Sequence, residues 1–135
     1  MAPVGSRESL AAAFQAGADS VYFGIGTLNM RSKSANEFTI DDLKEIASLC
    51  AERGVKSYLT VNTVIYEDLP LMRQIVDAAK EAKISAVIAS DAAVMMYCRQ
   101  QGVEAHLSTQ LNISNVEALK FYSQFADVVV LAREL

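Results

Sequence analysis

Apolar positions along the chain alternate between two spacings, one typical of helices and one typical of strands. Apolar residues recur at helical spacing after Ser6, a residue suited to an N-cap, and the helical pattern stops at Gly17. Residues 19–26, DSVYFGIG, then form an apolar run typical of a strand. A helix, a stop and a strand are therefore the first predicted unit.

The same unit recurs along the rest of the chain. Thr39 and Asp42 resemble a capping box that opens a helix ending at Gly54. The later helices also begin at residues that cap helices well: Asp68 with Pro70, Asp91, and Ser114 with Glu117. The strands that follow are predicted at residues 55–63, 84–91, 103–110 and 127–134, and residues 2–5 predict the frayed end of another.

Six strands alternating with helices predict an α/β fold with a parallel sheet joined by right-handed crossovers. The apolar run VVVLA at residues 128–132 predicts a strand buried on both faces. A closed barrel of this kind needs eight strands and about 250 residues. The 135 residues are expected to form a single domain, either a small doubly wound sheet or an incomplete TIM-barrel-like sheet with about six of the eight strands.

Composition narrows the class of protein further. The chain is 52% hydrophobic and 21% charged, which is typical of a globular protein, and its net charge of −4 gives no footprint for broad binding to a phosphate backbone. No apolar run approaches the roughly 20 residues that span a bilayer, and residues 1–9 do not resemble a signal peptide. We therefore expect a cytoplasmic protein without a membrane partner.

The cysteines are predicted to be small core or half-exposed thiols, and the methionines to pack in the core. Cys50 and Cys98 lie far apart in apolar helical segments and outside any metal-binding spacing, so neither a metal nor a cofactor is expected within this chain. Met72, Met95 and Met96 stand at helical spacing and are predicted to be buried.

Short polar residues follow the predicted strands at their carboxyl ends, where α/β proteins bind ligands. Each has a structural alternative: Asp91 as a helix cap, Asn62 as a partner of loop backbone, and Arg133 with Glu134 as a solvated terminus. Gln110 comes directly after a strand and before a capped helix, a position typical of a binding residue. The candidate substrate-binding residues of this group are Asn62, Asp91, Gln110, Arg133 and Glu134.

Two further candidates lie outside that group. Arg31 belongs to the polar loop at residues 29–39 and is suited to hold an anionic substrate group, although a merely solvated loop fits the same pattern. His106 falls on the same predicted strand face as Ser108, either as a binding residue or as a hydrogen-bonded inner histidine. Gly24 and Gly26 begin like a dinucleotide fingerprint, but Asn29 occupies the position of the third glycine and a loop follows, so this function is rejected.

The motifs APVGS at residues 2–6, STQ at 108–110 and LARE at 131–134 occur in this order, together with YLTVNT at 58–63. The set resembles the amino-terminal part of the peptidase U32 family, the collagenase-like proteases, and the resemblance covers essentially the whole chain. It implies a TIM-barrel-like catalytic domain within a longer protein. The downstream cysteine-bearing segment of the family does not occur in these 135 residues, and in some members such cysteines hold an iron–sulfur cluster.

The resemblance implies peptide-bond hydrolysis by the family label, with Arg31, Asn62, Gln110, Arg133 and Glu134 at the rim of the barrel. It leaves open hydroxylation of RNA or of a quinone precursor, because relatives carry out those reactions. Peptide or RNA is then the substrate of the full-length protein, and the present chain is expected to be an inactive part of it. A self-assembling α/β binding domain that forms a homodimer through the open barrel edge is the alternative.

Overall fold

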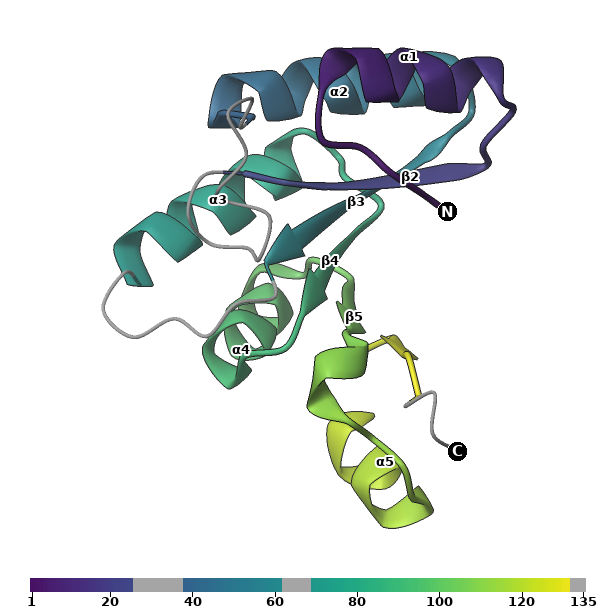
Figure 1. The fold of residues 1–135 in the computed structure, drawn as a ribbon. Helices are drawn as coiled ribbons and strands as arrows, with labels where there is room; N and C mark the ends of the chain where they lie inside the picture. Colours follow the sequence, from purple (N-terminus) through teal and green to yellow (C-terminus); the bar gives the residue numbers. More distant parts are fainter. Residues whose placement is uncertain (26–37, 62–68, 132–135) are drawn as a thin grey trace.

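The computed structural model describes residues 1–25, 38–61 and 69–131, in which strands and helices alternate along the chain (Figure 1). The strands are β1 (Ala2–Pro3), β2 (Ser20–Gly24), β3 (Lys56–Val61), β4 (Ala86–Ala89), β5 (Ala105–Leu107) and β6 (Val128–Val129). The helices are α1 (Arg7–Gln15), α2 (Ile40–Glu52), α3 (Leu69–Glu81), α4 (Ala92–Gln101) and α5 (Val116–Tyr122), with a 3₁₀ turn at Thr109–Leu111.

The six strands form one parallel sheet whose spatial order, β1-β2-β3-β4-β5-β6, is their order in the sequence. A doubly wound sheet reverses its strand order at a switch point, whereas a barrel adds each strand next to the previous one. The observed order therefore selects the TIM-barrel-like alternative. The predicted α/β class and the number of strands are confirmed.

The two faces of the sheet differ in what covers them. Phe23 pairs with Leu59, Leu59 with Val87 and Val87 with Ala105, and all four residues are buried in the core that the helices share. The labelled helices lie outside the curve of the strands in Figure 1. By the two-residue alternation of strands, the opposite, inner face carries Tyr22, Tyr58, Thr60, Ile88 and His106.

The predicted helix starts at Ser6, Thr39 and Asp91 are confirmed by hydrogen bonds. Ser6 Oγ accepts from the Ser9 backbone N–H at 3.1 Å, and Thr39 with Asp42 forms a complete capping box. The backbone N–H of Thr39 donates to the Asp42 carboxylate at 2.8 Å and is the main reason that the pKa of Asp42 is lowered. Each helix start could be predicted from nearby sequence, because the capping side chain accepts from an N–H group only two or three residues away.

Three predicted positions need correction. The last helix is capped by Asn115 and not by Ser114, since Asn115 Oδ1 accepts from the Ala118 N–H at 2.8 Å. The strand predicted over 103–110 ends at Leu107, because the chain turns there into the 3₁₀ turn. Met96 is 47% exposed, whereas Met72 and Met95 are buried as predicted.

The prediction of a buried strand at residues 128–132 is also wrong for the part that the structure describes. Val128, Val130 and Leu131 are 42%, 44% and 45% exposed. Within the described residues, strand β6 is the last strand of the sheet and pairs with β5 alone. In addition, α5 contributes no buried residue, so little covers the apolar side chains at this edge.

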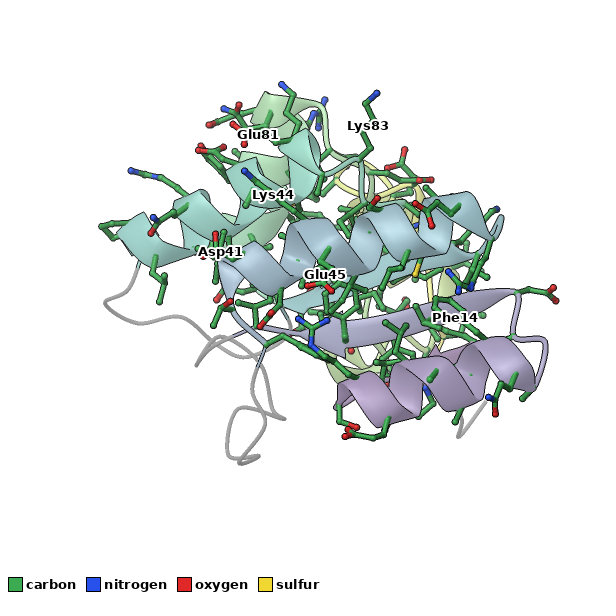
Figure 2. All side chains as sticks on the ribbon, turned by 90° about the horizontal axis from the view of Figure 1, so that it is seen from above. Phe14, Asp41, Lys44, Glu45, Glu81 and Lys83 are labelled. Atoms are coloured by element: carbon green, nitrogen blue, oxygen red, sulfur yellow. The ribbon has the colours of Figure 1, made fainter. Side chains whose placement is uncertain are left out.

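Charged side chains cover the outer surface of the helices (Figure 2). Lys44 on α2 lies 3.6 Å from Glu81 on α3, and Arg7 on α1 forms a bidentate contact with Glu45 on α2 at 2.7 and 2.8 Å. Such exposed pairs orient neighbouring helices but stabilise a fold only weakly. None of the helices in the described part of the chain is long and apolar enough to cross a membrane.

Candidate functional site

The parallel sheet brings the carboxyl ends of its strands to one edge, which we call the carboxyl edge. Asp91, Ser108 and the backbone of Gln110 follow β4 and β5 at this edge, as the sequence predicts. Helix α4 begins here as well, and Gln110 lies within the 3₁₀ turn that links β5 to α5. Four predicted site residues lie outside the described residues: Arg31, Asn62, Arg133 and Glu134.

Asp91 has a structural task at the carboxyl edge. Its Oδ1 accepts a hydrogen bond from the Ala93 N–H at 2.7 Å, and α4 starts at Ala92. Asp91 therefore caps α4, as the structural alternative predicts. A role in substrate binding remains a prediction.

We expect Asp91→Ala to lower the free energy of unfolding by about 1 kcal/mol, because the first turn of α4 loses its cap. Asp91→Asn is the matched variant, since an asparagine amide oxygen caps a helix equally well. Urea denaturation of the two variants measures the difference. Equal losses for both would contradict the capping role and leave the charge of Asp91 as the stabilising feature.

Hydrogen bonds between neighbouring strands hold the carboxyl edge in place. The Ser108 backbone N–H donates to the Ala89 carbonyl at 2.9 Å, and Ser108 is buried. Thr60 Oγ1 donates to the Phe23 carbonyl at 3.0 Å. These contacts link β2 to β3 and β4 to β5. They fix the positions of the strand ends from which the candidate site residues follow.

His106 lies on the inner face with an unsatisfied ring nitrogen. Its side chain is 14% exposed, and its ring centroid is 5.3 Å from that of Tyr58 at an interplanar angle of 42°. Nε2 is buried without a hydrogen-bond partner among the described residues; the nearest carboxylate oxygen, Glu104 Oε1, is 3.5 Å away. The sequence left open a hydrogen-bonded inner histidine, but the described residues provide no hydrogen bond to Nε2.

Glu104 and Tyr58 were not among the residues predicted for the site. The spacing of Glu104 and His106, two residues apart on one strand, was the signal that could have linked them, because such residues share a face. The approach of Tyr58 depends on the pairing of β3 with β4 and β4 with β5 and is not visible in the sequence.

The two cysteines lie on different helices, Cys50 on α2 and Cys98 on α4. Both are buried, which selects the core alternative over the half-exposed one, and burial raises the pKa of each thiol, that of Cys98 to about 12. Among the residues that the structure describes, no group of three or more His, Cys, Asp or Glu side chains is arranged to hold a metal ion.

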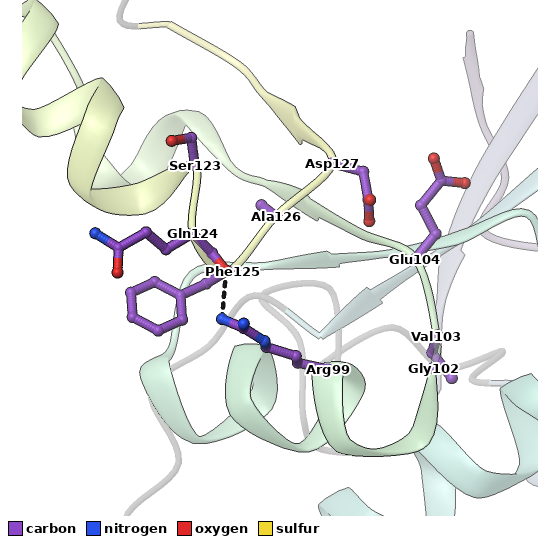
Figure 3. A pocket seen from close by; sticks show the side chains of 9 residues that line it. All are labelled: Arg99, Gly102, Val103, Glu104, Ser123, Gln124, Phe125, Ala126 and Asp127. Carbon is purple, nitrogen blue, oxygen red and sulfur yellow. Dashed lines mark hydrogen bonds between the residues drawn. The ribbon is translucent and has the colours of Figure 1, made fainter.

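A hollow of about 480 Å³ lies at the opposite edge of the sheet, near the amino ends of β5 and β6 (Figure 3). Arg99 Nη1 donates to the Gln124 carbonyl at 2.6 Å, and the Ala105 N–H donates to Asp127 Oδ2 at 3.2 Å. These two hydrogen bonds connect α4 and β5 to the segment between α5 and β6. In barrels of this type the amino edge serves stability and the carboxyl edge carries the chemistry, so we place the candidate site at the carboxyl edge and the adjoining inner face despite the size of the hollow.

Comparison with known families and proteins gives consistent matches. The family model described as "Peptidase family U32" matches residues 5–135. A protein named collagenase from Porphyromonas gingivalis is 72% identical over 136 residues, covering 100% of this chain and 33% of its own length. A protein named tRNA hydroxylation protein P1 from Bacillus subtilis is 35% identical over 138 residues, covering 99% of this chain and 32% of its own. The chain thus spans about a third of the length of these curated relatives.

A solved structure of a U32 peptidase superposes with a TM-score of 0.75 at 14% sequence identity. The alignment covers 96% of this chain and 56% of that one. At this identity the likeness concerns the fold, and it agrees with the sequential order of the parallel strands.

Proposed function

The chain belongs to peptidase family U32, and from that membership we propose that it forms the first strands of a barrel that hydrolyses peptide bonds within a longer protein. The observation that carries the proposal is the 72% identity, over the whole chain, to the P. gingivalis protein named collagenase. Because the chain corresponds to 33% of that relative, the proposed activity belongs to the whole protein, and the chain alone is expected to be inactive.

The proposed substrate is a collagen-type peptide bound at the carboxyl edge. The proposal assigns binding roles to Gln110 and Asp91, which follow β5 and β4 in the chain. The proposal also assigns substrate binding to the other predicted rim residues: Arg31, Asn62, Arg133 and Glu134. His106 contributes from the adjoining inner face.

The open edge at β6 is proposed to be covered by the strand and helix units that complete the barrel in the longer protein. Its apolar side chains include Val128, Val130 and Leu131, and β6 has a paired neighbour on one side within the described sheet. Exposed strand edges of this kind are otherwise prone to pair with another chain. A homodimer through this edge is the expected behaviour of the 135 residues when isolated.

Hydroxylation of an RNA base is the second candidate function. It is favoured by the B. subtilis relative named tRNA hydroxylation protein P1, which matches 99% of this chain. An iron–sulfur cluster would then be held by cysteines outside these 135 residues, since Cys50 and Cys98 lie on different helices and the described residues contain no group of three ligating side chains. The carboxyl edge would in that case orient a nucleotide through hydrogen bonds.

The test uses the full-length protein and a triple-helical collagen peptide, with cleavage followed by chromatography. Gln110→Ala is expected to lower kcat/KM about tenfold, the effect of losing one hydrogen bond to substrate. Gln124→Ala is the matched control, because Gln124 lines the hollow at the amino edge and should leave kcat/KM unchanged.

The same protein is incubated with tRNA, and hydroxylated nucleosides are measured by mass spectrometry. Peptide cleavage that responds to Gln110→Ala and not to Gln124→Ala supports the proposal. Hydroxylated tRNA without peptide cleavage would overturn it in favour of the second candidate. Equal losses for the two glutamine variants would contradict the placement of the site at the carboxyl edge.

A further inference from the structure

Buried polar atoms without partners are rare in proteins, and each calls for an explanation, of which a catalytic role is one. His106 Nε2 is such an atom among the described residues. Its ring packs against Tyr58, and its side chain is largely covered. A side chain that only filled this space would be better matched by an apolar residue, so the imidazole at this position needs a chemical explanation.

Glu104 is the one acidic group paired with His106 among the described residues. The two side chains lie on the same face of the β5 segment, two residues apart, with Oε1 3.5 Å from Nε2. Glu104 is 49% exposed and also lines the hollow at the amino edge (Figure 3), so its carboxylate is solvated and has room to move. Hydrogen bonds of this type are often long without substrate and shorten when it binds.

We propose that Glu104 and His106 form a carboxylate–imidazole pair in which Glu104 accepts the Nε2–H and thereby fixes the tautomer of His106. A neutral imidazole with its proton on Nε2 carries its free lone pair on Nδ1. The pair makes Nδ1 a proton acceptor for a substrate bound at the inner face. Glu104 acts as a positioning residue, and its negative charge stabilises the imidazolium once the proton has been taken up.

This step rests on the proposed function: in peptide hydrolysis, His106 takes up one proton and gives the same proton back. A water oxygen bonds to the peptide carbonyl carbon while a water proton passes to Nδ1. The proton then passes from Nδ1 to the peptide nitrogen as the C–N bond breaks, which returns His106 to its neutral form. No oxidant or further reactant is needed.

The tautomer can be measured directly, since His106 is the single histidine of the chain. The 135-residue protein labelled with ¹⁵N-histidine is recorded by long-range ¹H–¹⁵N NMR at a pH where the ring is neutral; its two nitrogen shifts distinguish the tautomers. The wild type is expected to show the Nε2–H form. Glu104→Gln is expected to shift the population toward the Nδ1–H form, whereas Glu117→Gln, on the exposed face of α5, should leave it unchanged.

The result that would overturn the proposal is an Nδ1–H tautomer in the wild type, or a spectrum that Glu104→Gln leaves unchanged. Far-UV circular dichroism checks that each variant is folded. Should Glu104→Gln fail to fold, Glu104→Asp replaces it: the shorter carboxylate also weakens the contact and is expected to shift the tautomer in the same direction, and an unchanged spectrum would again overturn the pair.

Kinetics of the full-length protein give the second readout. His106→Gln is expected to lower kcat at least about 100-fold with KM nearly unchanged, and Glu104→Gln about 10- to 100-fold. If the wild-type protein cleaves no peptide, the proposed function fails while the tautomer measurement still decides the pairing. If peptide is cleaved and kcat is indifferent to both variants, the proton-transfer role fails and the proposed function stands.

Discussion

Phe23→Ala is expected to lower the free energy of unfolding by about 3 to 5 kcal/mol, the usual cost of truncating a fully buried phenylalanine. Phe23 has no exposed surface, and its ring meets Phe38 edge to face with centroids 5.9 Å apart. It lies on β2 in the row of helix-facing residues that crosses the sheet to Leu59 and Val87. Urea denaturation followed by circular dichroism measures the loss.

Phe121→Ala is the matched control because it deletes the same atoms from an exposed site. Phe121 on α5 is 55% exposed, although its ring contacts Tyr122 and Phe125 at centroid distances of 5.1 and 5.6 Å. We expect a loss of no more than about 1 kcal/mol. Equal losses for the two substitutions would show that the core is not centred on the helix-facing side of the sheet.

Cys98 is expected to react with a thiol reagent about a thousand times more slowly in the folded chain than in urea at the same pH. Burial raises the pKa of Cys98 from 9.0 to about 12, and the thiolate is the reactive form. At pH 8 this difference lowers the thiolate fraction by roughly three orders of magnitude. The measurement is the rate of labelling in a Cys50→Ala variant, which leaves Cys98 as the single thiol.

The same pKa difference makes stability fall in alkali. The unfolded chain releases the Cys98 proton near pH 9, while the folded chain keeps it to about pH 12. Between these values the unfolded state binds fewer protons, so the free energy of unfolding decreases as pH rises, by up to about 1.4 kcal/mol per pH unit from this group. Below pH 9 the thiol is protonated in both states and contributes no slope.

Cys98→Ala should remove this part of the pH dependence, measured as the difference in slope between the variant and the parent from pH 9 to 11. Fast labelling in the folded chain, or identical slopes for parent and variant, would contradict a buried, protonated Cys98. Cys50 gives a weaker test, because its raised pKa is opposed by the nearby charge of Arg53.

The local features of the fold were predictable because each depends on residues close in sequence. Ser6, Thr39 and Asp91 cap their helices through hydrogen bonds that span two or three residues. The error at the last helix is of the same local kind: Ser114 and Asn115 are adjacent, both residue types cap helices well, and the choice of Asn115 was not visible in the pattern.

The sequence by itself determined the order of helices and strands, their parallel pairing and the placement of Asp91 and Gln110 beyond strand ends, since these follow from periodicity, caps and chain direction. Only the tertiary structure decided that the sheet adds its strands in sequential order, that β6 is an exposed edge, and that Tyr58 meets His106. The physical reason is that strand order and edge exposure are set by contacts between residues far apart in the chain. A pattern of apolar residues specifies which face of a strand is buried but not which strand lies beside it.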